Sequence, residues 1–246
     1  MTTSAQRLSL ILSQVSSHGK EKDSFVSVAA EVLCLEGEAR EIVALQKLIS
    51  LINEVQRDIE RLPIEDEHKQ HLLKFLNALN GLRNLSQVHQ NMENVKRNFL
   101  KPENVVNITN IHLALSGHFE STELPREEGE LAANFRELKL KVQKSSLPHH
   151  AKVSISIRVN QIASILDCSY AFTPEELKVE LDALVGSIVV ASKEKTPKSS
   201  TLLGSLAAAA AAGFVLLGKA DKNLGHLVSI GENGERLIEF FKESSE

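Results

Sequence analysis

Residues 199–218 read SSTLLGSLAAAAAAGFVLLG, a run of 20 residues that has no charged side chain and lies between Lys198 and Lys219. With a rise of about 1.5 Å for each residue, a helix over this run is about 30 Å long, which matches the hydrocarbon core of a bilayer. Upstream, the chain is mostly polar, and its apolar residues recur at the spacing of amphipathic helices. The central question is whether the run lies in lipid or in the core of a soluble bundle.

The composition of the run is compatible with both environments. Alanines 207–212 are close to neutral and the glycines and hydroxyl residues oppose insertion, while each Leu, Phe or Val contributes only about −0.3 to −0.6 kcal/mol. Helices of soluble bundles usually carry a polar stripe, which this run lacks, and this favours a membrane. The residues predicted to insert into a membrane are Leu202, Leu203, Leu206, Phe214, Val215, Leu216 and Leu217.

The overall composition argues against a nucleic-acid partner. The chain has 28 basic and 32 acidic residues, so it has no basic field, and it lacks tryptophan for stacking on bases. The apolar stretch at 8–12 is interrupted by Ser9 and is not followed by the small-residue cleavage site of a secretory signal. We therefore expect a cytoplasmic protein, either soluble or associated with a membrane.

Two long amphipathic segments lie between residues 24 and 99. In both, apolar residues recur at steps of three and four, which predicts helices with a heptad-like seam. Pro63 separates them, because proline removes a backbone donor and biases the preceding residue away from helix. We expect an antiparallel helical hairpin with arms of about 50 Å. The residues predicted to form its interaction seam are Val32, Leu35, Ile42, Ile49, Leu79, Leu82, Val88 and Val95.

The rest of the chain also favours helices, and Thr173, Pro174 and Glu176 have the spacing of a capping box at the start of one of them. The expected fold class is an all-α, elongated bundle built on the hairpin, with a C-terminal apolar helix. Residues 152–159 alternate apolar and polar as a strand does, yet a lone strand has no partner, and a helix is the better prediction. The predicted domains are a short amphipathic helix at 1–22, a helical bundle at 23–190, a charged linker at 191–200, and an apolar helix with an amphipathic tail at 201–246.

The motifs that suggest chemistry are all incomplete. Residues 213–219 fit G-x-x-x-x-G-K, but Ala220 stands where a phosphate loop has the hydroxyl that binds Mg²⁺. Glu65 and His68 form one E-x-x-H, and a di-iron bundle needs a second copy. Ser192 and Lys195 fit S-x-x-K without its companion motifs. We therefore predict no catalytic residues, no metal site and no cofactor.

Two functions of different classes follow. The first is a non-enzymatic helical protein that acts at a membrane through residues 199–218, as an anchor or by inducible insertion and pore formation. This layout resembles that of α-helical pore-forming proteins in architecture alone, with no shared motif. The alternative is a soluble interaction module (an adaptor, immunity factor or scaffold) in which 201–217 form a buried bundle helix. The partner is membrane lipid in the first case, and another protein or a second copy of the chain in the alternative.

Overall fold

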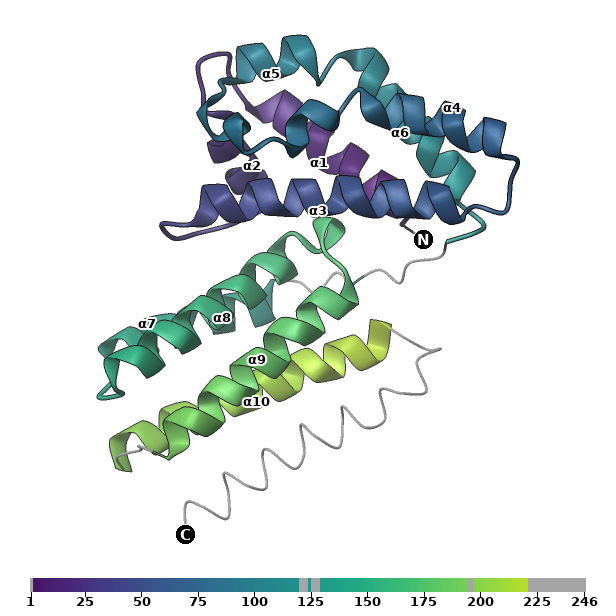
Figure 1. The fold of residues 1–246 in the computed structure, drawn as a ribbon. Coiled ribbons are helices and arrows are strands. Elements are labelled where there is room, and N and C mark those ends of the chain that lie inside the picture. The colour runs from purple at the N-terminus through teal and green to yellow at the C-terminus, as the bar shows by residue number, and fades with distance from the viewer. Residues whose placement is uncertain (1, 120–123, 125–128, 194–196, 221–246) are drawn as a thin grey trace. The chain divides into compact units, whose positions relative to one another are not determined.

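The computed structural model describes residues 2–119, 124, 129–193 and 197–220, without the side chains of residues 85, 88, 197, 198 and 220. The regular elements in these residues are helices, and an isolated antiparallel bridge joins Ser24 to Asn91. The predicted all-α fold is therefore confirmed. The chain divides into two compact units, Met1–Ser121 and Thr122–Glu246 (Figure 1). The domain boundaries expected from the sequence stay predictions, and residues 221–246 of the predicted tail lie outside the described residues.

The first unit packs around one long helix. Its helices are α1 (Ser4–His18), α2 (Phe25–Val32), α3 (Arg40–Arg61), α4 (Asp66–Asn77), α5 (Met92–Asn98) and α6 (Pro102–Leu115). The central helix, α3, contacts α1, α2, α4 and α6. On α1, Leu8, Ile11 and Val15 are fully buried, as the amphipathic pattern predicts. Burying a side chain of this size stabilises the fold by roughly 1.5–3 kcal/mol.

The long hairpin is not confirmed, because both of its arms are interrupted. The first arm breaks between α2 and α3, where Cys34 has a φ of 54° and Gly37 a φ of 96°. Such left-handed conformations cannot continue a right-handed helix. The turn at Pro63 does end α3, and α3 packs against α4. A shorter antiparallel pair is therefore present where the sequence predicts two 50 Å arms.

The second arm is interrupted by two short 3₁₀ helices, Asn80–Arg83 and Leu85–His89. Asparagine side chains start new elements here: Asn84 accepts a hydrogen bond from the Ser86 amide at 2.9 Å, and Asn91 accepts one from the Asn94 amide at 3.0 Å. Asparagine competes with helical hydrogen bonding in this way, which favours caps over helix interiors. The apolar spacing continues across these breaks, because side chains of the irregular segments still enter the core.

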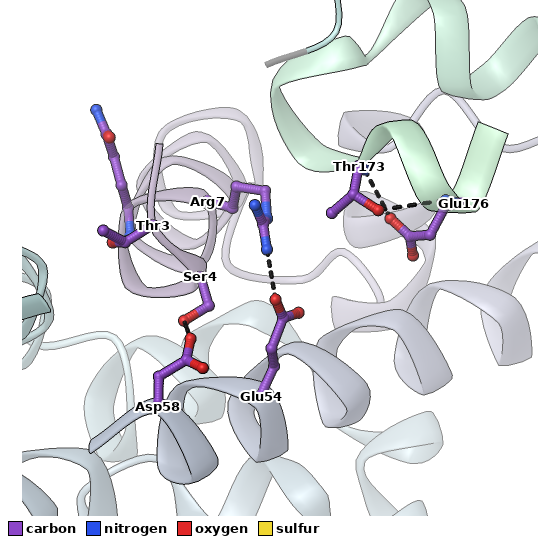
Figure 2. A network of polar contacts seen from close by, with 8 residues as sticks. Thr3, Ser4, Arg7, Glu54, Asp58, Thr173 and Glu176 are labelled. Carbon is purple, nitrogen blue, oxygen red and sulfur yellow. Dashed lines mark hydrogen bonds and ion pairs between the residues drawn. The ribbon is translucent and has the colours of Figure 1, made fainter. Parts of the chain in front are cut away.

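Buried polar contacts fasten α1 to α3 (Figure 2). Arg7 is 3% exposed and its Nη2 lies 2.6 Å from Oε1 of Glu54. One turn earlier, the Ser4 hydroxyl donates to Oδ2 of Asp58 at 2.5 Å. A buried guanidinium is costly unless it is paired, so the Arg7–Glu54 contact fixes the register of these two helices.

The second unit is a four-helix bundle in the described residues 129–193 and 197–220. Its helices are α7 (Glu130–Lys144), α8 (His149–Asp167), α9 (Pro174–Ser192) and α10 (Pro197–Ala220), with a 3₁₀ turn at Ser169–Ala171. Each helix packs against the next, and α10 packs back against α7, which closes the ring. One core of apolar side chains is shared by all four helices. Short connections of this kind join antiparallel neighbours.

Side-chain contacts give the register of neighbouring helices. Lys152 on α8 donates to the carbonyl of Gln143 on α7 at 3.3 Å, and Arg136 pairs with Asp167 at the opposite ends of the same helices. Between α8 and α9, the hydroxyls of Ser154 and Ser187 lie 2.8 Å apart, and Arg158 pairs with Glu180 at 3.0 Å. For each pair of neighbouring helices, the contact with the higher residue number on one helix has the lower residue number on the other. The helices of each pair therefore run antiparallel.

Two local predictions for this unit are confirmed. Residues 152–159 lie within α8 and form no strand. Thr173 begins α9 with a capping box: its Oγ1 accepts from the Glu176 amide at 3.2 Å, and Glu176 Oε2 accepts from the Thr173 amide at 2.9 Å (Figure 2). Both contacts satisfy amides that the first turn of a helix leaves without intrahelical partners.

We predict that the packing of α1 on α6 weakens at acid pH. Nδ1 of His112 lies 2.9 Å from Oγ1 of Thr3, the cap of α1, and burial lowers the pKa of His112 below its ordinary value of 6.5. The unfolded chain therefore binds this proton more readily. The resulting contribution to stability is complete above about pH 6.5 and is lost as the pH falls toward the folded-state pKa.

Hydrogen exchange of the α1 and α6 amides, corrected for intrinsic rates, measures this effect. We expect protection to fall between pH 7.5 and 5.5 in the wild type and to change less in His112→Gln. His89→Gln, at an exposed position of the same unit, is the control and should behave as the wild type. Equal pH dependence in His112→Gln and the wild type would contradict the assignment.

Candidate functional site

The apolar run forms most of α10, the last helix of the four-helix bundle. Within the described part of the chain, Ser199–Lys219 is the one stretch that is long and apolar enough to cross a membrane, and half of its most apolar window is buried. It packs against α9 on one side and α7 on the other. The candidate functional site is therefore a membrane-length helix that is also part of a folded core.

One face of α10 supplies large side chains to the bundle core. Leu203 and Leu206 are fully buried, and Phe214 is 5% exposed. Leu216 and Leu217 are buried as well, whereas Leu202 is half-buried and Val215 is 57% exposed. Five of the seven residues predicted to insert into a membrane thus lie inside the protein in this structure. Their role in insertion stays a prediction.

The alanines and one glycine let α10 approach its neighbours closely. Ala207, Ala209 and Ala210 are at most 3% exposed. At Gly213 the approach is closest, because a Cβ atom there would lie 2.8 Å from Cδ2 of Leu181 on α9. Small side chains at such contacts permit dense packing between helix backbones, in water as in lipid.

The opposite face of α10 is exposed and carries no charge along five turns. The hydroxyl of Ser205 donates to the carbonyl of Thr201 at 3.0 Å and so bonds within its own helix. The exposed residues, spaced by three and four, are Thr201, Ser205, Ala208, Ala212, Val215 and Gly218. By contrast, the exposed face of α7 carries charged residues such as Glu137 and Lys141, which pair at 2.7 Å. Of these two helices, α10 is the one without the solvated face expected in a soluble bundle.

The predicted interaction seam lies mainly inside the first unit. Val32, Leu35, Leu79, Leu82 and Val95 are buried. Ile49 is half-buried and Ile42 is 54% exposed, whereas the side chain of Val88 lies outside the described residues. In this conformation a partner would reach Ile42 more easily than the others, and the role of the seam stays a prediction.

The histidines considered for metal binding lie on α4, in the first unit. His68 is 70% exposed and lies 3.8 Å from Glu65, and the ring of His71 packs on the edge of Phe75. Among the residues that the structure describes, no group of three or more His, Cys, Asp or Glu side chains is placed to hold a metal ion. The G-x-x-x-x-G-K match at 213–219 lies within helix α10 rather than in a loop between a strand and a helix.

Comparison of the chain with protein-family models, curated proteins and solved structures found no match.

We predict that lysine is tolerated on one face of α10 and not on the other. Ala209 is 3% exposed, so Ala209→Lys places a charge in the bundle core and should destabilise the second unit by about 3–5 kcal/mol. Ala208 is exposed, so Ala208→Lys should change stability by less than about 0.5 kcal/mol. Thermal unfolding followed by circular dichroism compares the two variants. Similar melting of both would mean that α10 is not packed in solution as described.

Proposed function

We propose that this chain is a non-enzymatic helical protein that keeps α10 in a four-helix bundle and acts at a membrane by releasing it. The observation that carries the proposal is that α10 has no charged side chain from residue 199 to residue 218, on either its buried or its exposed face. A helix selected only for a soluble core usually retains a polar stripe. A helix that also enters lipid is expected to lack a polar stripe, because charged side chains are costly in the hydrocarbon core.

Such a transfer costs α10 itself little. Its backbone hydrogen bonds close within the helix, so they persist in the hydrocarbon core. Leu203, Leu206 and Phe214 move from one apolar environment to another. The cost arises on the other three helices, whose shared core loses its cover. Release therefore needs a compensating event, such as contact of the exposed bundle core with lipid.

Burial of half of the apolar window supports the inducible form over a constitutive anchor. An anchor outside a folded domain has no need of large side chains placed in a core. Here Leu203, Leu206 and Phe214 fill the bundle interior, so the soluble conformation serves as the resting state. Pore formation would then follow from insertion of several copies.

A soluble interaction module is the second candidate, and the same burial favours it. If α10 serves only as a bundle helix, the protein acts through its surface. Ile42 is the exposed member of the predicted seam, and it could take part in binding a protein partner or a second copy of the chain. Behaviour in the presence of lipid separates the two candidates.

The first experiment is fractionation of the expressed chain, followed by an alkaline carbonate wash of the membrane pellet. Retention after washing supports an integral segment, and dye release from liposomes then separates an anchor from a pore. Recovery of all the protein as a soluble folded species contradicts a constitutive anchor. Added liposomes then distinguish insertion on contact with lipid from a purely soluble module.

We predict that Ala208→Lys leaves the protein folded and removes carbonate-resistant association with liposomes. Ala208 is exposed in the bundle but lies near the middle of the membrane-length run, where a lysine costs about 2.5–3.5 kcal/mol on insertion. The matched control is Ala133→Lys, at an exposed position on α7. Lipid insertion that is equal in both variants and the wild type would contradict a role of α10 in the membrane.

A further inference from the structure

One end of the four-helix bundle is basic. Because neighbouring helices are antiparallel, the C-terminal ends of α7 and α9 and the N-terminal ends of α8 and α10 lie at the same end, at the lower left of the bundle in Figure 1. We call this the basic end and define it by Lys141, Lys144, Lys152 and Lys193. Lys144 and Lys193 are exposed, and the ammonium of Lys152 reaches the carbonyl of Gln143 across the connection between α7 and α8.

Acidic residues are nearly absent from this end in the described residues. Over the eight residues of each helix nearest to it, the one acid is Glu137, which pairs with Lys141 at 2.7 Å. In the sequence, the connection between α9 and α10 has Lys195 and Glu194, which lie outside the described residues. The opposite end is rich in acids, which are Glu130, Asp167, Glu175, Glu176 and Glu180. The second unit therefore carries its charges in a polarised arrangement.

Exposed aliphatic side chains surround the lysines of the basic end. Leu140 on α7 is 55% exposed and precedes Lys144 by one turn. On α8, Val153 is 44% exposed beside Lys152. In the last turn of α9, Val190 is 54% exposed. Lysines next to exposed aliphatic side chains complement a surface whose outer layer is anionic and whose next layer, a few ångströms deeper, is apolar.

We propose that the basic end docks the second unit on the surface of an anionic membrane. Charge complementarity selects anionic headgroups, each lysine near such a surface contributing to binding. The aliphatic side chains favour lipid over nucleic acid, because they can enter the boundary between headgroups and acyl chains. A nucleic-acid surface offers phosphates and stacked bases, and this end has no Phe, Tyr or Trp in the described parts of its helices.

The proposal deepens the proposed function, because α10 begins at this same end. Docking would bring residues 197–204 to the headgroups, so that the apolar run starts at the membrane surface. Docking through lysines is nevertheless a separate event from insertion of α10. It depends on salt and is reversed by alkaline carbonate, whereas insertion is not.

The experiment measures co-sedimentation of the full chain with vesicles of phosphatidylcholine alone or with 30% phosphatidylserine, at low and high salt. We expect binding to phosphatidylserine vesicles at low salt and its loss at high salt. Lys144→Gln combined with Lys193→Gln should lower the partition coefficient, by about fivefold for each lysine. Both side chains are exposed, so the variant should melt as the wild type does.

The matched control is Lys74→Gln combined with Lys101→Gln, two exposed lysines of the first unit that give the same change in net charge. Val190→Asn tests the aliphatic contribution against Val106→Asn, since these valines are 54% and 58% exposed. An equal loss of binding to phosphatidylserine vesicles in the basic-end variant and in its control would overturn the proposal. Binding to a DNA duplex as tight as to the vesicles would overturn the assignment to lipid.

The readouts distinguish the two proposals. If docking is right and the proposed function is wrong, the wild type binds at low salt but carbonate removes it completely. If the proposed function is right and docking is wrong, carbonate-resistant protein persists in the Lys144→Gln and Lys193→Gln variant at the wild-type level and rate, and the salt dependence is absent.

Discussion

The packing of α10 against α9 and α7 is the contact on which the second unit depends. A four-helix ring has a closed core only when its last helix returns to its first, and α10 makes that return. Its contribution combines bulk with proximity: Leu203, Leu206 and Phe214 fill the interior, while Gly213 brings the backbone close to Leu181. Removing α10 would expose buried side chains on α7 and α9, the two helices that it packs against, and would open the core that all four helices share. The same contacts thus stabilise the bundle and keep the apolar run out of water.

The fold class could be predicted from the sequence because apolar spacing decides which faces are buried. On α1 and α9 that spacing, together with the Thr173 capping box, gave elements that the structure confirms. Continuity of helices was harder to predict. The same spacing runs through the breaks around Cys34 and Asn84, because packing into a core requires an inward side chain and does not require a helical backbone. Gly37 and the asparagines Asn84 and Asn91 were the available signals for these breaks, whereas the left-handed Cys34 had none in the sequence.

The sequence could predict which residues form the candidate site, but it could not predict what they pack against. Length and lack of charge pointed to the apolar run without any structural information. Its environment depends on which residues of α7 and α9 meet it, and single-sequence periodicity carries no such long-range information. The basic end was likewise hidden, because its lysines come from connections about 50 residues apart, Lys144 and Lys193, and cancel against acids in the overall charge. Only the antiparallel topology gathers them.

An apolar helix that is kept in a soluble bundle and later enters lipid has different requirements on its buried face and on its exposed face. The buried face must hold α10 firmly enough for the soluble state to persist, which large side chains such as Leu206 achieve. The exposed face must remain free of charge if the helix is to enter lipid, and small residues such as Ala208 and Ala212 limit the apolar area that water contacts. An alanine-rich helix satisfies both requirements, since alanine costs little in water, in a packed core or in a bilayer. The alanine run of α10 is therefore the composition expected of a helix that occupies two environments, whereas a helix confined to the bundle could carry charged residues at these exposed positions at little cost to the fold.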